Sequence, residues 1–318
     1  MEPKKYSTVL HLLGNCPIRK EIEIVELERV QRDGFVQVLI EYAVEECHEY
    51  IRIQDNDTIS KVQAYLLIPD GIRGKAPAVV AIHQHHSNWD VGKSEVVGLA
   101  GEKEYAYGMD LARRGYVVIA PDLLCFESRK GLYEYDAKDM HFLYERFQMN
   151  KYLFRGETLQ GKTLRDLSAA VDVLFSLDCV DKYNMGAIGH SLGGQEALWL
   201  AWYDHRVKVV ASSCGTSTYK EFYRSGYQLN SWEIIPGLET VCDMDLIIIH
   251  VTQERKVIMT TGLDDDRHCP LRGMECIETM VADQGVKDNF VLVRFDGEHR
   301  FLKEQKRQVY EFFDENLK

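Results

Sequence analysis

The chain has 318 residues, of which 45% are hydrophobic and 28% are charged, and its formal net charge is −12 at pH 7. A chain of this length and apolar content can bury one large core. The acidic balance argues against a surface that binds nucleic acid or anionic membranes. No apolar run reaches the length of a membrane-spanning helix, so we expect no membrane partner. The partner that we expect instead is a small-molecule substrate.

The cysteines and the first residues of the chain indicate the cellular compartment of the protein. The eight cysteines form no C-x-x-C pair, and Cys125, Cys179 and Cys214 lie in or beside apolar segments, which favours reduced, buried thiols. The start Met-Glu-Pro-Lys-Lys-Tyr has no apolar core of a secretory signal. We therefore expect a cytoplasmic protein, and no pattern in the sequence predicts its oligomeric state.

The first 60 residues differ from the rest of the chain. Residues 1–30 are charged and predict helical or irregular structure. Residues 35–53 and 61–68 alternate apolar and polar side chains, which predicts antiparallel strands. We accordingly expect an N-terminal extension with entry strands over residues 1–60, packed on a main domain over residues 61–318.

Nearly continuous apolar runs mark the strands of the main domain. They occur at residues 78–82, 116–120, 207–212 and 257–261. Such runs are typical of strands that are covered on both faces. Helical patterns alternate with them, so the sequence predicts an α/β fold with a mostly parallel central sheet and helices on both faces.

Two aromatic-rich segments interrupt the alternation of strands and helices. They cover residues 130–156 and 216–238. We expect these segments to lie near the functional site and to form its rim or a partial cap.

The pentapeptide Gly189-His190-Ser191-Leu192-Gly193 reads G-x-S-x-G. It follows the apolar run 185–188 and precedes a helix-forming run over residues 195–203. Strand, tight turn and helix in this order are the context of a nucleophile elbow. The serine there has a strained backbone, and the flanking glycines permit close packing. We therefore expect Ser191 to be a nucleophile.

A histidine and a carboxylate must follow such a serine along the chain, each after a strand. His299 lies between a strand-like run over residues 290–295 and a helical tail over residues 303–317. This position suits a general base, because a serine hydroxyl needs a partner that takes its proton and returns it to the leaving group. The sequence thus predicts a pair of Ser191 and His299.

The carboxylate that orients the imidazole is expected after the strand at residues 256–261, in a loop with three consecutive aspartates. We favour Asp266, because the chain returns from it through Pro270 into the following helix. Asp265, three residues after Gly262, is the alternative.

An acyl-transfer site also needs hydrogen-bond donors aimed at the oxyanion. The backbone N–H of Leu192 is one, and the loop after the strand at residues 78–82 supplies the other. We assign that second donor to Gln84, with His85 as the alternative. Four side chains are expected to contact the substrate: His85, His86, Trp89 and His190.

The chain resembles the dienelactone hydrolase and acetyl xylan esterase-like family of α/β-hydrolases over roughly residues 60–315. The resemblance rests on the triad positions and on several segments: His83-Gln84-His85 with Gly92-Lys93, the strand 114–122, Phe126-Glu127-Ser128-Arg129, and Ile235-Pro236-Gly237-Leu238. It implies an α/β-hydrolase catalytic domain over residues 61–318 that hydrolyses small-molecule esters without a cofactor. Among the esters, those with a short acyl group such as acetyl are the substrates that we expect first. The loop that carries the aspartates is one residue longer than the family pattern, so the choice between Asp265 and Asp266 as the carboxylate that orients the imidazole stays open.

Other chemistries remain as alternatives. A serine peptidase or a thioesterase is possible on the same fold, although the chain lacks a propeller or other gating domain. A metal-dependent hydrolase would use His83, His85 and His86, because closely spaced histidines are good zinc ligands. The binuclear pattern H-x-H-x-D-H is not completed after His86, so we expect no metal.

Overall fold

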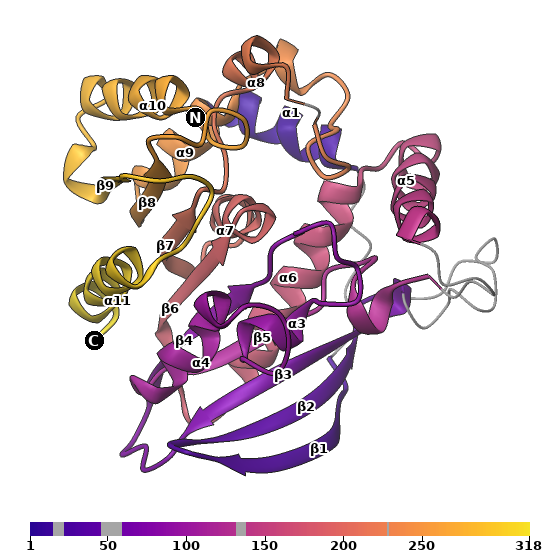
Figure 1. Cartoon of the computed structure of the whole chain (residues 1–318), viewed down its shortest axis with the longest axis vertical. Coiled ribbons are helices and arrows are strands. Elements are labelled where there is room, and N and C mark those ends of the chain that lie inside the picture. Colours follow the sequence, from indigo (N-terminus) through magenta and orange to yellow (C-terminus); the bar gives the residue numbers. More distant parts are fainter. Residues whose placement is uncertain (15–21, 46–58, 132–137, 228) are drawn as a thin grey trace.

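The computed structural model describes residues 1–14, 22–45, 59–131, 138–227 and 229–318. These residues form a nine-stranded sheet with the order β1-β2-β3-β5-β4-β6-β7-β8-β9 (Figure 1). The strands are β1 (Ile24–Arg32), β2 (Phe35–Ala43), β3 (Lys61–Pro69), β4 (Ala76–Ile82), β5 (Val117–Pro121), β6 (Val180–His190), β7 (Val207–Ser213), β8 (Lys256–Gly262) and β9 (Phe290–Phe295).

The sheet is antiparallel at its N-terminal edge and parallel elsewhere. β1, β2, β3 and β5 pair antiparallel, and β5, β4, β6, β7, β8 and β9 pair parallel. The predicted entry strands are therefore confirmed over residues 35–43 and 61–69, and residues 46–58 lie outside the described part of the chain. The prediction of helical or irregular structure over residues 1–30 was wrong for residues 24–30, which belong to the edge strand β1.

Helices cover both faces of the sheet, as the apolar runs predicted. The helices are α1 (Pro3–Leu13), α3 (Lys93–Val96), α4 (Tyr107–Arg113), α5 (Lys138–Phe154), α6 (Leu159–Ser176), α7 (Leu192–Tyr203), α8 (Tyr219–Ser225), α9 (Met244–Thr252), α10 (Leu271–Asp283) and α11 (Lys303–Leu317), with short 3₁₀ helices at Lys103–Tyr105, Glu127–Arg129, Leu238–Thr240 and Lys287–Asn289. In the described ranges no helix is both long and apolar enough to cross a bilayer.

Two hydrophobic cores lie on opposite faces of the sheet. The larger contains buried side chains of α6, α7, α9 and α10, and the smaller contains those of α4 and α11. In β4, Ala78, Val80 and Ile82 belong to the larger core, whereas Val79 and Ala81 belong to the smaller one. This alternation follows from the two-residue period of a strand, and it explains why β4 is apolar throughout.

The parallel strands end at one edge of the sheet, and the loops after β4, β6, β8 and β9 meet there. Ligand sites of parallel α/β sheets lie at this carboxyl edge. Each of these loops carries residues that the sequence marked as functional: Gln84 after β4, Ser191 after β6, the aspartates after β8 and His299 after β9.

Candidate active site

Ser191 occupies a sharp turn between β6 and α7. Its backbone has φ +53° and ψ −124°, a left-handed conformation that costs energy for a residue with a side chain. A Cβ at Gly189 would lie 2.1 Å from the carbonyl carbon of Gly193, and a Cβ at Gly193 would lie 2.0 Å from the carbonyl oxygen of Ile82. The predicted strand, turn and helix are confirmed, and both glycines are required by close backbone contact.

His299 contacts the carboxylate of Asp265, not that of Asp266. Its Nδ1 lies 2.6 Å from Oδ2 of Asp265, whose side chain is buried. The amide of Asp265 donates to the carbonyl of Gly262, and this turn buries Asp265 and leaves Asp266 exposed. The preference for Asp266 is therefore corrected to the alternative, Asp265, because the side chain of Asp266 faces solvent.

Asp265 is also bound by a second histidine. Its Oδ1 accepts a hydrogen bond from the backbone N–H of His268 at 3.2 Å and lies 3.4 Å from Nδ1 of that residue. Burial opposes the ionised form of Asp265, but the hydrogen bonds from His268 and His299 outweigh burial and lower the pKa of Asp265. The carboxylate is therefore charged at neutral pH and can hold an N–H of His299.

The remaining ring nitrogen of His299 is free to act on a proton. Nε2 is buried and has no hydrogen-bond partner among the described residues. Since Nδ1 donates its proton to Asp265, Nε2 carries a lone pair. His299 and Ser191 line one cavity of about 900 Å³. Nε2 of His299 makes no hydrogen bond to Ser191 in this structure, so what the geometry shows is an imidazole and a serine that line the same cavity.

The loop after β4 is held by His83. The backbone N–H of Leu123 donates to Nε2 of His83 at 3.0 Å, so Nδ1 carries the proton and donates to the carbonyl of Gln84 at 2.8 Å. Burial lowers the pKa of His83, which keeps the ring neutral. The Gln84 side chain donates to Glu95 at 3.2 Å. Gln84 and Leu192, the two expected oxyanion donors, both line the cavity.

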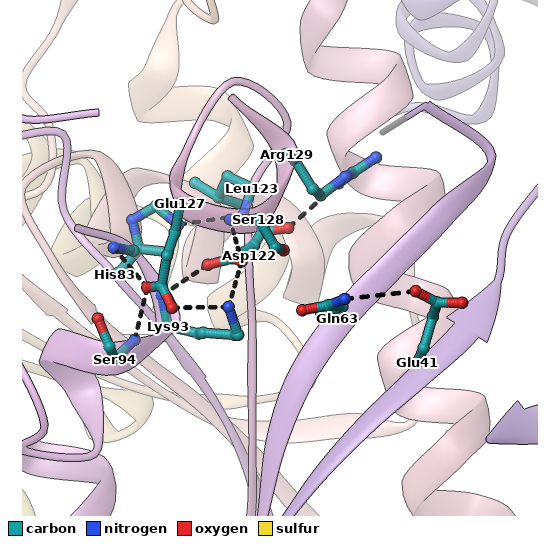
Figure 2. A network of polar contacts seen from close by, with 11 residues as sticks. Glu41, Gln63, His83, Lys93, Ser94, Asp122, Leu123, Glu127, Ser128 and Arg129 are labelled. Carbon is teal, nitrogen blue, oxygen red and sulfur yellow. Dashed lines mark hydrogen bonds and ion pairs between the residues drawn. The ribbon is translucent and has the colours of Figure 1, made fainter. Parts of the chain in front are cut away.

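A buried cluster of charged side chains lies next to this loop. Figure 2 shows Lys93 between the carboxylates of Asp122 and Glu127, with Nζ 2.7 Å from an oxygen of each. Asp122 also accepts from the backbone N–H of Lys93, and Glu127 from that of Ser94. A Cβ at Gly92 would lie 2.4 Å from Asp122. The segment that resembles the family signature therefore has a structural role, which is to fix the chain around His83.

The first of the two aromatic-rich segments contributes a carboxylate to the rim of the cavity. Glu145 of α5 accepts hydrogen bonds from His85 at 2.8 Å, Trp89 at 3.0 Å and Ser231 at 2.6 Å. These contacts join α5, the loop after β4 and the segment around residue 231. Burial opposes ionisation of Glu145, but these donors, His85 foremost, lower its pKa. The cavity is lined by four residues of α5 (Phe142, Glu145, Arg146 and Met149) and by residues 227, 229–231, 233 and 234. Residues 132–137 and 228 lie outside the described part of the chain.

The four expected substrate contacts divide into two groups. His85, His86 and Trp89 line the cavity. His190 does not, because its ring is fully buried, lies 4.8 Å from the rings of both Tyr105 and His299, and hydrogen-bonds to Ser213. The prediction for His190 is therefore wrong: it packs beneath the site.

The metal-dependent alternative needs free ring nitrogens on the histidines at 83–86. Both ring nitrogens of His83 and of His85 are occupied by hydrogen bonds within the protein. In the described ranges, the metal-binding side chains that cluster are instead Cys214, Asp265 and His299.

Several cavity residues were missed by sequence reasoning. They are Gln195, Cys214, Asn230, Ser231, Glu233 and, as a partner of Asp265, His268. Glu233 is buried, and burial raises its pKa to about 8. No motif marks these residues, because their places in the cavity depend on how α5 and residues 229–234 pack.

Comparison with known proteins places this site in a family. A model of the prolyl oligopeptidase family matches residues 151–318. A Bacillus subtilis (strain 168) protein with the provisional name hydrolase YtaP is 26% identical over 311 residues, which cover 94% of each chain.

Solved structures agree with the fold. A Bacteroides fragilis NCTC 9343 protein with the provisional description acetyl xylan esterase has a TM-score of 0.70 at 16% identity, covering 92% of this chain and 74% of the other. Glucuronoyl esterase from Solibacter usitatus has a TM-score of 0.66 at 12% identity, covering 98% and 92%. The predicted α/β-hydrolase fold and the resemblance to acetyl xylan esterase-like proteins are confirmed.

Proposed function

The chain belongs to the prolyl oligopeptidase family of α/β-hydrolases, and we propose that it is a serine hydrolase that cleaves carboxylic esters through an acyl-serine intermediate. One observation carries the proposal: Nδ1 of His299 is hydrogen-bonded to the buried carboxylate of Asp265, and Nε2 has no partner in the part of the chain that the structure describes. His299 lines the same cavity as Ser191.

In the first half of the reaction, Ser191 attacks the ester carbonyl. Nε2 of His299 takes the hydroxyl proton as the bond forms, and the ring becomes a cation. Asp265 remains ionised, since its pKa is lowered, and stabilises that cation through Nδ1. The ring then gives the proton to the departing alcohol, and the acyl group stays on Ser191.

The tetrahedral intermediate carries a negative oxygen that needs donors already in place. We assign them to the backbone N–H groups of Leu192 and Gln84. Leu192 is the first residue of α7, so its N–H belongs to a helix N-terminus that favours negative charge. Hydrogen bonds to the His83 ring and to the Glu95 carboxylate fix the position of Gln84. In the second half, a water activated by His299 attacks the acyl group and regenerates Ser191.

The substrate assigned to this site is a carboxylic ester with a short acyl group such as acetyl. The names of the structural neighbours, acetyl xylan esterase and glucuronoyl esterase, support ester chemistry. The cavity rim carries hydrogen-bonding side chains, including Gln195, Asn230 and Ser231, beside Trp89 and Tyr227. Such a rim suits a polar alcohol group better than a long alkyl chain.

The test is an acyl-chain-length series. Para-nitrophenyl acetate, butyrate and decanoate are offered to the wild type and to Ser191→Ala, with and without a chelator. We expect acetate to have the highest kcat/KM, no loss of activity with the chelator, and loss of hydrolysis in Ser191→Ala. Preference for decanoate would contradict the acyl assignment. Faster cleavage of a prolyl peptide amide than of any ester would favour the peptidase alternative.

A further inference from the structure

Cys214 lies beside the carboxylate and histidine of the proposed triad. It follows β7 directly, and one ligand atom from each of Cys214, Asp265 and His299 lies within 4.8 Å of the other two. The three residues come from the ends of β7, β8 and β9, which are neighbouring parallel strands. The sheet therefore gathers a thiol, a carboxylate and an imidazole at one point.

This donor set matches one class of ion. Zn²⁺ binds thiolate sulfur, imidazole nitrogen and carboxylate oxygen, and it accepts three protein ligands with water as the fourth. Ca²⁺ and Mg²⁺ prefer oxygen ligands alone. We propose that Cys214, Asp265 and His299 form an inhibitory Zn²⁺ site.

The ion can reach the cluster through the cavity. Cys214 and His299 both line it, so a water molecule from the cavity can complete the coordination. The thiol of Cys214 donates a weak hydrogen bond to the carbonyl of Arg300 at 3.7 Å. Zn²⁺ must therefore displace the thiol proton to solvent, and binding strengthens as pH rises.

Inhibition rests on the proposed function, but binding does not. If Zn²⁺ takes Nε2 of His299, it occupies the lone pair that would accept the Ser191 proton. If it takes Nδ1, it replaces the hydrogen bond to Asp265. In both cases the ring can no longer serve as the base, so hydrolysis stops while the fold remains.

The binding experiment uses the full chain carrying Ser191→Ala, so that no activity is needed. Zn²⁺ is titrated by calorimetry into Ser191→Ala, Ser191→Ala with Cys214→Ser, and Ser191→Ala with Cys276→Ser. Cys276 is an exposed cysteine of α10 and controls for loss of a thiol elsewhere. We expect Cys214→Ser to weaken one site by at least about tenfold and Cys276→Ser to leave it unchanged.

A second measurement follows the thiol proton that Zn²⁺ displaces from Cys214. Repeating the titration in buffers of different ionisation enthalpy should reveal proton release on Zn²⁺ binding to the parent, and less release with Cys214→Ser. Circular dichroism verifies that each variant is folded, and Cys214→Ala repeats the comparison with a different side chain. Equal Zn²⁺ affinity and equal proton release in folded Cys214 variants and in the parent would overturn the site.

The activity experiment separates the inference from the proposed function. Ester hydrolysis of wild type and Cys214→Ser is measured with Zn²⁺, Mg²⁺ or Ca²⁺, each relative to the same enzyme without the ion. We expect Zn²⁺ alone to inhibit, with at least about tenfold more ion needed for Cys214→Ser. Absence of hydrolysis in every sample would contradict the proposed function and leave the binding result standing. Equal inhibition of both enzymes would overturn the inference.

Discussion

Nδ1 of His299 lies 2.6 Å from Oδ2 of Asp265, and this contact joins the loops that follow β8 and β9. Backbone hydrogen bonds reinforce it, since the amides of Leu263 and Asp264 donate to the carbonyls of Phe295 and Gly297 at 2.9 Å each. The orientation of the imidazole is thus set by two loops that hold each other.

Asp265→Asn and Asp266→Asn form a matched pair that tests this contact. Asparagine at 265 cannot stabilise the imidazolium and favours the wrong tautomer, so we expect kcat for ester hydrolysis to fall by about 10³- to 10⁴-fold. The exposed Asp266 should tolerate the change within about twofold. Steady-state kinetics on one ester measure both. A larger loss for Asp266→Asn would show that the acid is misassigned.

The fold was predictable from the sequence where burial of a strand on both faces requires apolar residues. The runs at 78–82 and 257–261 are apolar because β4 and β8 are covered on both faces. β1 could not be recognised in the same way, since it is an edge strand whose residues, Ile24–Arg32, are almost all exposed. Its pairing with β2, not its own apolar content, makes it a strand.

Gly193→Ala tests the close contact between the elbow and β4. An added Cβ would lie 2.0 Å from the carbonyl oxygen of Ile82 and 2.7 Å from that of His83, so we expect loss of soluble folded protein or a fall in Tm of roughly 10 °C. Gly71→Ala is the control for backbone strain alone, because its φ of +70° is left-handed and no atom lies within 4 Å of an added Cβ, whereas Gly193 lies in α7 and has no left-handed φ. Thermal unfolding of both proteins separates the contact from backbone strain. Equal effects would mean that the contact is unimportant.

Glu145→Ala tests whether the rim is held together by one carboxylate. The change leaves donors of His85, Trp89 and Ser231 without their acceptor, which costs about 1–3 kcal/mol per buried group. We expect KM to rise by about tenfold with a smaller fall in kcat, because the substrate cavity loosens while the triad remains. Glu145→Gln keeps one acceptor and should lie between Ala and wild type. An unchanged KM in folded Glu145→Ala would contradict this role.

Glu196 provides a prediction about pH and stability. Burial raises its pKa to about 8 from an ordinary value of 4.5, against the hydrogen bonds from Gln160 and Gln195. Between these values the folded protein keeps a proton that the unfolded chain has lost, so the free energy of unfolding falls as pH rises through the window. Glu196→Gln has no carboxyl group at this position, so its free energy of unfolding lacks this pH dependence.

The Tm of the wild type relative to Glu196→Gln should therefore drop as pH rises from 4.5 to about 8. Even a single unit of pKa difference is worth about 1.4 kcal/mol, or roughly 2 °C for a chain of this size. Differential scanning fluorimetry measures it, with Glu315→Gln as an exposed control. A Tm difference that is constant with pH, or that grows in favour of the wild type, would contradict the raised pKa.

The candidate site was only partly predictable from sequence. Ser191 and His299 could be predicted as a pair because their positions after strands follow a chain-order rule, and the structure has them line one cavity. Asp265 and its neighbour could not be separated, since the choice depends on which of two adjacent side chains the turn after Gly262 buries. Glu145 left no signal, because its partners lie about 60 and 86 residues away along the chain and meet it only through the packing of α5.

The most direct test of the central claim is covalent labelling by a fluorophosphonate, read by mass spectrometry of the intact protein and its peptides. The reagent phosphonylates a serine only when a base activates it. We expect one adduct per chain, on the peptide that contains Ser191, and none in Ser191→Ala, His299→Gln or Asp265→Asn at the same exposure. Ser217→Ala, in a buried serine outside the cavity lining, should label as the wild type does. An adduct on another serine, or undiminished labelling of Ser191→Ala, would contradict the account.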